Sequence, residues 1–139
     1  MSTKMSTIPL LTWVLLIAGV LLNAGAQLLI KAGTNSMGAP IGELVADSGI
    51  GPVLLKVITN WWILGGLASY VVSVGLWIIV LSQVPVSMAY PMLSIGYVVN
   101  AFAALVLFHE LLSVHQWIGI GIIVAGVILV ANPKLFGAA

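Results

Sequence analysis

The sequence contains no cysteine, and only 5% of its 139 residues are charged. The absence of cysteine excludes a disulfide framework, a thiol nucleophile and a thiolate metal site. Soluble domains carry about 25% charged residues, so this chain cannot cover its surface with polar groups. A net charge of +1 provides no basic face, which argues against a nucleic-acid partner. Since 62% of the residues are hydrophobic and the mean hydropathy is +1.26, we expect the chain to be surrounded by lipid.

Four apolar segments dominate the chain, each near the length of about 20 residues that crosses a bilayer. They cover residues 8–30, 61–81, 84–108 and 114–131, and the charged residues lie at their ends or between them. Four isolated strands cannot close a barrel, so the segments are predicted to be helices. We therefore expect an all-α membrane protein in which residues 1–139 form a single four-helix transmembrane domain.

The connections between these segments differ in length. Residues 32–60 form a long connection that is rich in glycine, serine, asparagine and proline. Two interpretations of it stay open: a mildly amphipathic segment along the membrane surface, or an irregular loop. The link before the last segment is short, and Ser113 followed three residues later by Gln116 has the spacing of a capping box.

The four lysines are divided evenly between the two ends of the predicted helices. Lys4 and Lys134 fall at one end, and Lys31 and Lys56 at the other. Membrane orientation normally follows an excess of positive charge on the cytoplasmic side. The sequence provides no such excess, so we expect either insertion in both orientations or an orientation that a partner imposes.

Polar residues form a stripe on the first predicted helix. Asn23, Gln27 and Lys31 are spaced four residues apart and therefore share one face. Membrane amides often serve only to join helices by hydrogen bonds, whereas three polar residues in one stripe favour the lining of a cavity. Lys31 lies at the helix end, where its side chain can extend to the membrane surface and act as an anchor.

The third segment carries the most unusual run of the chain, VPVSMAYPMLS at residues 84–94. Polar groups and a proline inside a membrane helix cost free energy unless they face protein, water or a ligand. A second polar stripe follows along this segment, formed by Tyr90, Ser94, Tyr97 and Asn100. Asn100 and Asn23 are both about 12 Å from the same membrane face at 1.5 Å per residue. They are therefore expected to line one cavity or to bond to each other.

The remaining two segments are less informative. Tyr70, Ser73 and Trp77 share a face of the second segment, and such aromatic stripes more often serve packing. The last segment has few polar atoms but several small residues, with Gly121 and Ala125 at a spacing suited to close helix contacts. We expect this last helix to serve assembly.

No aspartate, glutamate, histidine or arginine lies in the middle of any segment. Pumps coupled to protons or cations normally need such a buried group to carry the charge. Glu110, at the end of the third segment, is the nearest candidate, either for coupling or for a salt bridge with Lys31. His109 and His115 match no metal-binding spacing. We expect no catalytic residue, metal site or cofactor.

These features together resemble the drug/metabolite transporter superfamily, which includes the small multidrug resistance proteins. The resemblance rests on NAGAQLLIK at residues 23–31, on VPVSMAYPMLS and on FHELLSVHQWIGIGIIVAGVILV at residues 108–130. Within the superfamily, the third-segment motif is most similar to the small flippase subunits for 4-amino-4-deoxy-L-arabinose-phosphoundecaprenol. The resemblance implies a multi-pass protein of the bacterial inner membrane that works as a homodimer or a heterodimer with a similar small subunit.

The departures from the drug exporters concern the residues that bind and exchange protons. Those exporters carry a glutamate eight residues before the lysine of the first helix, where this chain has Asn23. They also carry a tryptophan three residues after a tyrosine in the third helix, where this chain has Leu93 after Tyr90. An amide neither exchanges a proton nor neutralises a cationic drug, so the resemblance implies the fold without the antiport chemistry.

We therefore expect a transporter subunit that helps an undecaprenyl phosphate-linked sugar to cross the membrane. Its sugar would be bound by the two polar stripes, and Lys31 would attract the phosphate. Two alternatives remain open on the sequence alone: an exporter of a small polar or cationic metabolite, and an accessory membrane subunit that transports nothing.

Overall fold

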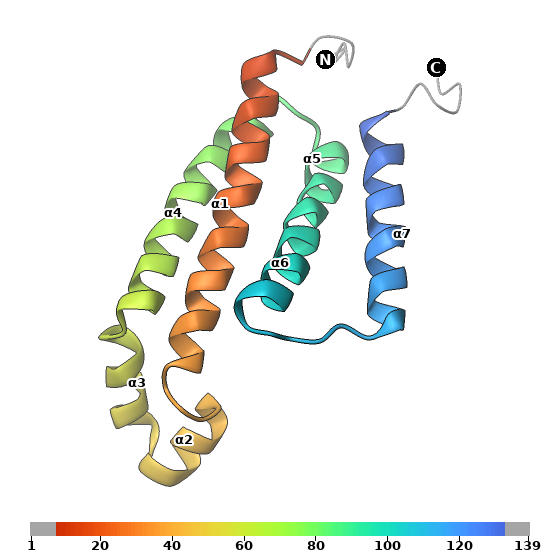
Figure 1. The fold of residues 1–139 in the computed structure, drawn as a ribbon. Coiled ribbons are helices and arrows are strands. Elements are labelled where there is room, and N and C mark those ends of the chain that lie inside the picture. Colours follow the sequence, from red (N-terminus) through yellow and green to blue (C-terminus); the bar gives the residue numbers. More distant parts are fainter. Residues whose placement is uncertain (1–7, 133–139) are drawn as a thin grey trace.

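In the computed structural model, which describes residues 8–132, the chain forms seven α-helices and no strand within that range. Four of its helical stretches are long and apolar enough to cross a membrane, and they run alternately up and down (Figure 1). They are α1 (Leu10–Asn35), α4 (Trp61–Leu81), α5 with α6 (Val86–Met92 and Ser94–Leu107) and α7 (Val114–Ala131). The prediction of an all-α protein with four membrane spans is confirmed.

The first helical pair, α1 and α4, packs without space for side chains at two glycines. A Cβ atom added to Gly66 of α4 would meet Ile30 Cγ1 at 2.7 Å and the Ala26 carbonyl oxygen at 2.9 Å. A Cβ atom on Gly33 of α1 would meet Ile63 Cγ1 at 2.5 Å. Close backbone approach is the usual way in which membrane helices gain packing energy, because lipid provides no hydrophobic drive between them.

One side chain joins the adjacent ends of α1 and α4. Asn60 precedes α4, and its Oδ1 accepts hydrogen bonds from the backbone N–H groups of Trp62 and Ile63 at 3.0 and 3.2 Å. Its Nδ2 donates to the Gly33 carbonyl oxygen at 3.3 Å and to Ser36 Oγ at 3.0 Å. The same residue therefore caps one helix and supplies a donor to the end of the other.

The long connection between α1 and α4 is not an irregular loop throughout, which is one of the two interpretations that the sequence leaves open for residues 32–60. It holds two short helices, α2 (Ile41–Ser48) and α3 (Ile50–Ile58), which lie beyond the end of α4 in Figure 1. Gly49 separates them with φ 82°, a backbone conformation that glycine adopts readily. α1 also extends to Asn35, five residues past the predicted end at residue 30.

The third span is not the continuous helix predicted for residues 84–108. Pro91 lacks the N–H group that would continue the hydrogen-bond ladder, and α5 ends one residue later, at Met92. Leu93 separates α5 from α6, and its N–H donates to the Tyr90 carbonyl oxygen at 3.0 Å. This bond spans three residues, as in a tighter helical turn.

The buried core lies where α1 meets the chain around the start of α5. Leu16, Val20, Val80, Ala89 and their neighbours form one buried apolar cluster. By contrast, α7 has no fully buried residue and packs mainly along α5 and α6. The predicted capping box at its start is confirmed, because the Ser113 and Gln116 side chains each bond to the backbone of the other residue. Lys4 and Lys134 lie outside the described residues.

Candidate functional site

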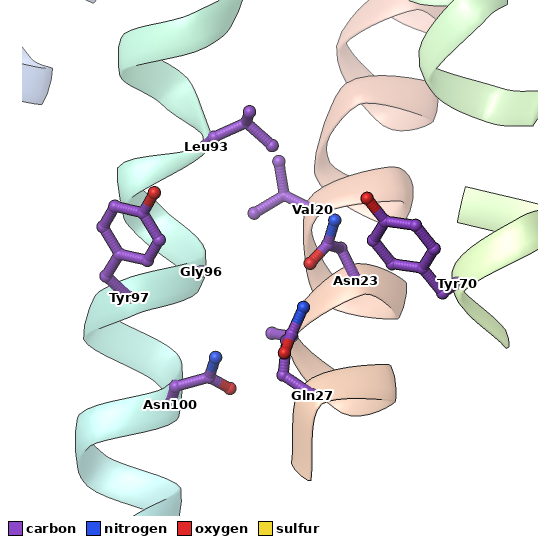
Figure 2. Close-up of a pocket in the computed structure, with 9 residues that line it drawn as sticks. Val20, Asn23, Gln27, Tyr70, Leu93, Gly96, Tyr97 and Asn100 are labelled. Atoms are coloured by element: carbon purple, nitrogen blue, oxygen red, sulfur yellow. The ribbon is translucent and has the colours of Figure 1, made fainter. Parts of the chain in front are cut away.

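A cavity of about 440 Å³ opens between α1, α4 and the third span. Its polar lining consists of Asn23 and Gln27 from α1, Tyr70 from α4, and Tyr97 and Asn100 from α6. Figure 2 shows the Asn100 amide directed across the cavity toward the two amides of α1. The close approach of α6 to α1 at Gly96 positions these groups, since a Cβ there would lie 3.5 Å from Val20 Cγ1.

The cavity offers neutral hydrogen-bonding groups and no charged side chain. Primary amides both donate and accept, and phenol hydroxyls do the same. The Oδ1 atom of Asn100 is buried and accepts no hydrogen bond. A buried acceptor without a partner costs about 1–3 kcal/mol. A bound ligand with a hydroxyl or amine donor would remove that cost.

A second hollow of about 220 Å³ adjoins the first and shares Asn23, Tyr70 and Leu93 with it. It extends along α4 to Trp77 and reaches Tyr90 of α5. The rings of Trp77 and Tyr90 contact each other edge to face, with centroids 5.8 Å apart. The two hollows together form one polar groove beside the break in the third span.

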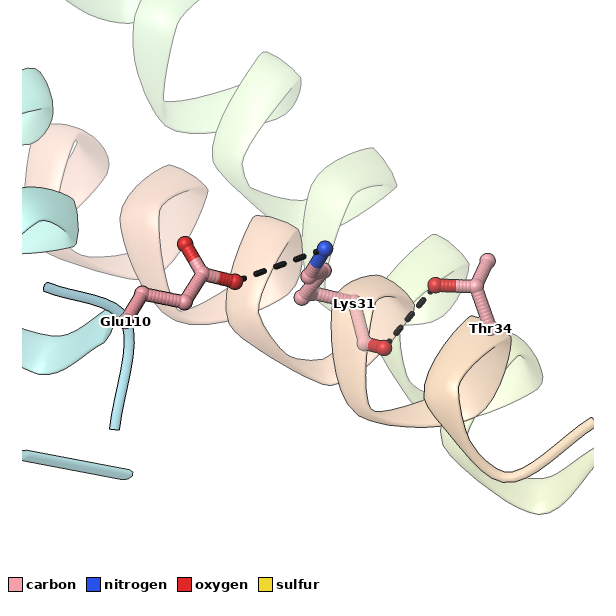
Figure 3. Close-up of polar contacts among 3 residues, drawn as sticks. All are labelled: Lys31, Thr34 and Glu110. Atoms are coloured by element: carbon pink, nitrogen blue, oxygen red, sulfur yellow. Dashed lines mark hydrogen bonds and ion pairs between the residues drawn. The ribbon is translucent and has the colours of Figure 1, made fainter. Parts of the chain in front are cut away.

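Lys31 lies at the end of the polar stripe but outside the lining of this groove. Its Nζ lies 3.4 Å from Glu110 Oε1 (Figure 3), so the two predicted residues are adjacent at one membrane face. Thr34 Oγ1 donates to the Lys31 carbonyl oxygen at 2.9 Å. Lys31 also lines a separate hollow of about 360 Å³ with Thr34 and Asn35 at the end of α1.

The predicted site residues therefore divide into groups. Asn23, Gln27, Tyr97 and Asn100 surround the larger hollow, and Tyr90 lines the smaller one. Ser94 is half-buried at the start of α6 and lines neither hollow. Sequence reasoning assigned Tyr70 to packing, yet it lines both hollows. Its position in the middle of an apolar segment was the available signal, because interfacial anchoring explains tyrosines only near segment ends.

The arrangement suits binding rather than bond chemistry. Among residues 8–132, no group of three or more histidine, cysteine, aspartate or glutamate side chains could hold a metal ion. Within the groove, the side-chain groups able to hydrogen bond are amides, phenols, the Trp77 indole and the Ser73 hydroxyl. The Ser73 hydroxyl donates its proton to the Tyr70 carbonyl oxygen at 2.7 Å, so this proton is used in a hydrogen bond within α4.

Comparisons with known proteins point to transport. Residues 1–132 match the model of the EamA-like transporter family. A stretch of 71 residues is 41% identical to the probable 4-amino-4-deoxy-L-arabinose-phosphoundecaprenol flippase subunit ArnE of Aeromonas hydrophila. The subunits of the same name from Aeromonas salmonicida and Escherichia coli O45:K1 are 39% and 38% identical over the same length.

These similarities cover only part of each chain. The matched stretch is 51% of this chain, and it is 62% of the two Aeromonas subunits and 64% of the Escherichia coli subunit. The chain thus spans less than two thirds of the curated relatives that it matches. No solved structure shows a significant match to it.

Proposed function

The chain belongs to the EamA-like transporter family, and we propose that it is a flippase subunit for a polyprenyl phosphate-linked sugar in the bacterial inner membrane. It would move its substrate across the bilayer without catalysing a reaction. Its ArnE relatives are named for aminoarabinose linked to phosphoundecaprenol, and a sugar of this kind is the substrate that we propose here.

The observation that carries the proposal is the uncharged polar cavity. A sugar needs many hydrogen bonds to replace its water as it enters the membrane, and each missing bond costs free energy. Asn23, Gln27 and Asn100 offer both donors and acceptors there, and Tyr70 and Tyr97 add hydroxyls. The unpartnered Asn100 Oδ1 would accept a hydrogen bond from a sugar hydroxyl or amine.

We assign the phosphate of this substrate to Lys31. Lys31 follows Gln27 by one turn of α1, so its ammonium group lies next to the groove at a membrane face. An ammonium group attracts phosphate as a point charge. The phosphate would compete with the Glu110 carboxylate, which lies 3.4 Å from Lys31 Nζ.

A second subunit would complete the pathway. The four spans leave the groove open, and no residue of α7 is fully buried against the rest of the described chain. Cβ atoms added to Gly119, Gly121 and Gly126 of α7 would meet no atom within 4 Å. Small residues on an unpacked membrane helix allow close contact with another helix. The ArnE relatives are named as subunits, and we propose a homodimer or a heterodimer with a similar small protein.

The test is transport of a lipid-linked aminosugar in reconstituted vesicles that contain the protein with its partner. Wild-type protein is expected to expose the sugar to the opposite leaflet, where a membrane-impermeant amine reagent labels it. Asn23→Leu and Asn100→Leu should abolish that labelling while leaving assembled protein. If both variants instead lose assembly in proportion to transport, the chain is an accessory subunit whose amides only join helices.

The alternative of a metabolite exporter makes a different prediction in the same vesicles. An exporter would deplete a water-soluble cationic metabolite from the lumen and leave the lipid-linked sugar in its original leaflet. The cavity lining carries no acidic side chain to neutralise a cation, whereas the lipid-linked aminosugar brings its own phosphate, which a soluble cationic metabolite lacks. We therefore expect no competition between a cationic metabolite and the lipid-linked sugar.

A further inference from the structure

An apolar groove of about 550 Å³ runs along the face of α1 that is turned away from the polar cavity. Its floor is formed by α1, with Leu21, Gly25, Leu28 and Ala32 at spacings that place them on one side of the helix. Trp62 of α4 is one of its walls, and the end of α6 is the other. The groove therefore lies between helices and is open on one side, where Leu21, Trp62 and Leu107 are about half exposed.

The groove and the polar cavity lie on opposite sides of α1, and Lys31 lies on the polar side, next to the end of the groove. Asn23 follows Leu21 by two residues, which is about 200° around the helix axis at 3.6 residues per turn. Lys31 follows Gln27 by four residues, so it lies on the polar side of α1, the side from which Val20 contacts Gly96 of α6. The groove ends at Ala32, which follows Lys31 in the sequence, and at Phe108, which is two residues before Glu110. Lys31 and Glu110 form an ion pair beside this end.

We propose that this groove binds the phosphate-proximal part of a polyprenyl chain. The inference rests on the proposed function and adds a tail site to it. In this arrangement the isoprenoid units lie along Gly25 and Leu28, the phosphate is held by Lys31, and the sugar occupies the polar cavity on the other side. The amphiphilic substrate would thus pass around the end of the contact between α1 and α6, with its phosphate at the Lys31 ammonium group.

The size of the groove favours a flexible chain over a protein helix. An α-helix with its side chains is about 10–12 Å wide, so a hollow of 550 Å³ would hold only about one turn of it. A hydrocarbon chain is much thinner and can lie along the groove, where it gains van der Waals contacts and not hydrophobic free energy, because lipid already surrounds it. The ammonium group at the groove's end adds attraction for a lipid that carries a phosphate.

A leucine at position 25 tests the tail site because it fills the groove without displacing the fold. A Cβ atom added to Gly25 meets no atom within 4 Å. Gly75 of α4 is equally free of neighbours but lies outside the groove, so Gly75→Leu is the matched control. Binding of undecaprenyl phosphate, which has no sugar, is measured by native mass spectrometry on the full chain with its partner.

We expect Gly25→Leu to weaken undecaprenyl phosphate binding by about tenfold, or roughly 1.4 kcal/mol, and Gly75→Leu to leave it unchanged. Asn23→Leu should also leave it unchanged, because the probe has no sugar to enter the polar cavity. Equal binding by Gly25→Leu and Gly75→Leu would overturn the tail site. So would displacement of undecaprenyl phosphate by an equal concentration of phosphatidylglycerol, since the occupant would then be ordinary membrane lipid.

A labelling experiment covers the case in which Gly25→Leu fails to assemble. The chain has no cysteine, so Leu21→Cys introduces a single thiol in the groove, at a position that is 47% exposed. Undecaprenyl phosphate should slow its reaction with a lipid-soluble maleimide. The matched thiol of Val71→Cys lies on α4 outside the groove and should react at the same rate with and without the lipid. If only Asn23→Leu lost transport, the sugar site would be affected. The protection of the Leu21→Cys thiol by undecaprenyl phosphate would still support the tail site.

Discussion

Lys31 and Glu110 join the end of α1 to the segment that follows α6, with 3.4 Å between Nζ and Oε1. A left-handed residue precedes the carboxylate: His109 has φ 54°, and the Glu110 N–H turns back to donate to the Ala104 carbonyl oxygen at 3.2 Å. Non-glycine residues adopt this conformation uncommonly. The turn after α6 therefore directs Glu110 toward α1 rather than continuing the helix (Figure 3).

The ion pair makes a small contribution to stability, and Glu110→Gln is expected to keep both fold and transport. Each side chain is 49% exposed, and pairs of this kind are worth up to about 1 kcal/mol. Since no acidic, histidine, lysine or arginine side chain lines the polar groove, transport should proceed in vesicles without a pH gradient. The midpoint of thermal unfolding and the initial transport rate are measured for wild type and variant.

Lys31→Gln is the matched change at the other partner. It removes the same ion pair but also the ammonium group that we assign to the phosphate, so transport should fall while the unfolding midpoint matches that of Glu110→Gln. A folded Glu110→Gln protein without activity would contradict this prediction. If wild-type transport also changed the lumenal pH, Glu110 would be a proton carrier and the flippase mechanism would be wrong.

Asn100→Leu should abolish transport without lowering stability. The wild-type Oδ1 is buried without a hydrogen bond, so the protein already bears a cost of about 1–3 kcal/mol that leucine removes. Thr12→Val is the control for a polar group that does join helices, because the buried Thr12 hydroxyl donates to Gln83 Oε1. That control should lose about 1 kcal/mol of stability and keep transport. A destabilised Asn100→Leu protein would indicate that its amide serves packing.

The membrane spans and the neighbours across them could be predicted from the sequence because both depend on local properties. Transfer of apolar residues into lipid decides where the spans lie, and short links force adjacent spans to be antiparallel. The same topology brings Lys31 and Glu110 to one membrane face, and helical periodicity places Asn23 and Gln27 together. Asn100 joins them because its depth matches that of Asn23.

The features that the sequence did not reveal depend on contacts between distant residues. A proline can either kink a span or end a helix, and the break at Leu93 accompanies the packing of Gly96 against α1. Tyr70 belongs to the cavity because α4 crosses α1 at Gly66, and no local pattern gives the rotation of α4 about its axis. The helices α2 and α3 have too few residues for periodicity to distinguish them from a loop.

Gly66→Ala should destabilise the pair of α1 and α4 by about 1–3 kcal/mol, as expected when a methyl group is forced into a packed contact. The added Cβ would lie 2.9 Å from the Ala26 carbonyl oxygen, which is backbone and cannot rotate away. Gly75→Ala on the same helix meets no atom within 4 Å and should change stability by less than about 0.5 kcal/mol. Unfolding in detergent with increasing denaturant measures both. Equal stability of the two variants would contradict the observed crossing.

The last prediction concerns orientation in the membrane. Lys31 and Lys56 lie at the end of the bundle that carries α2 and α3, and Lys4 and Lys134 balance them in the sequence. Without an excess of positive charge at one end, the chain alone should insert in both orientations. Single cysteines at Asn35, the last residue of α1, and at Ser82, which follows α4, report opposite faces. In intact cells without a partner, an impermeant maleimide should label part of the protein at each of the two cysteine positions. Coexpression of the partner should confine labelling to one of these positions. Labelling of only one position in the absence of any partner would show that features other than lysine charge orient this chain.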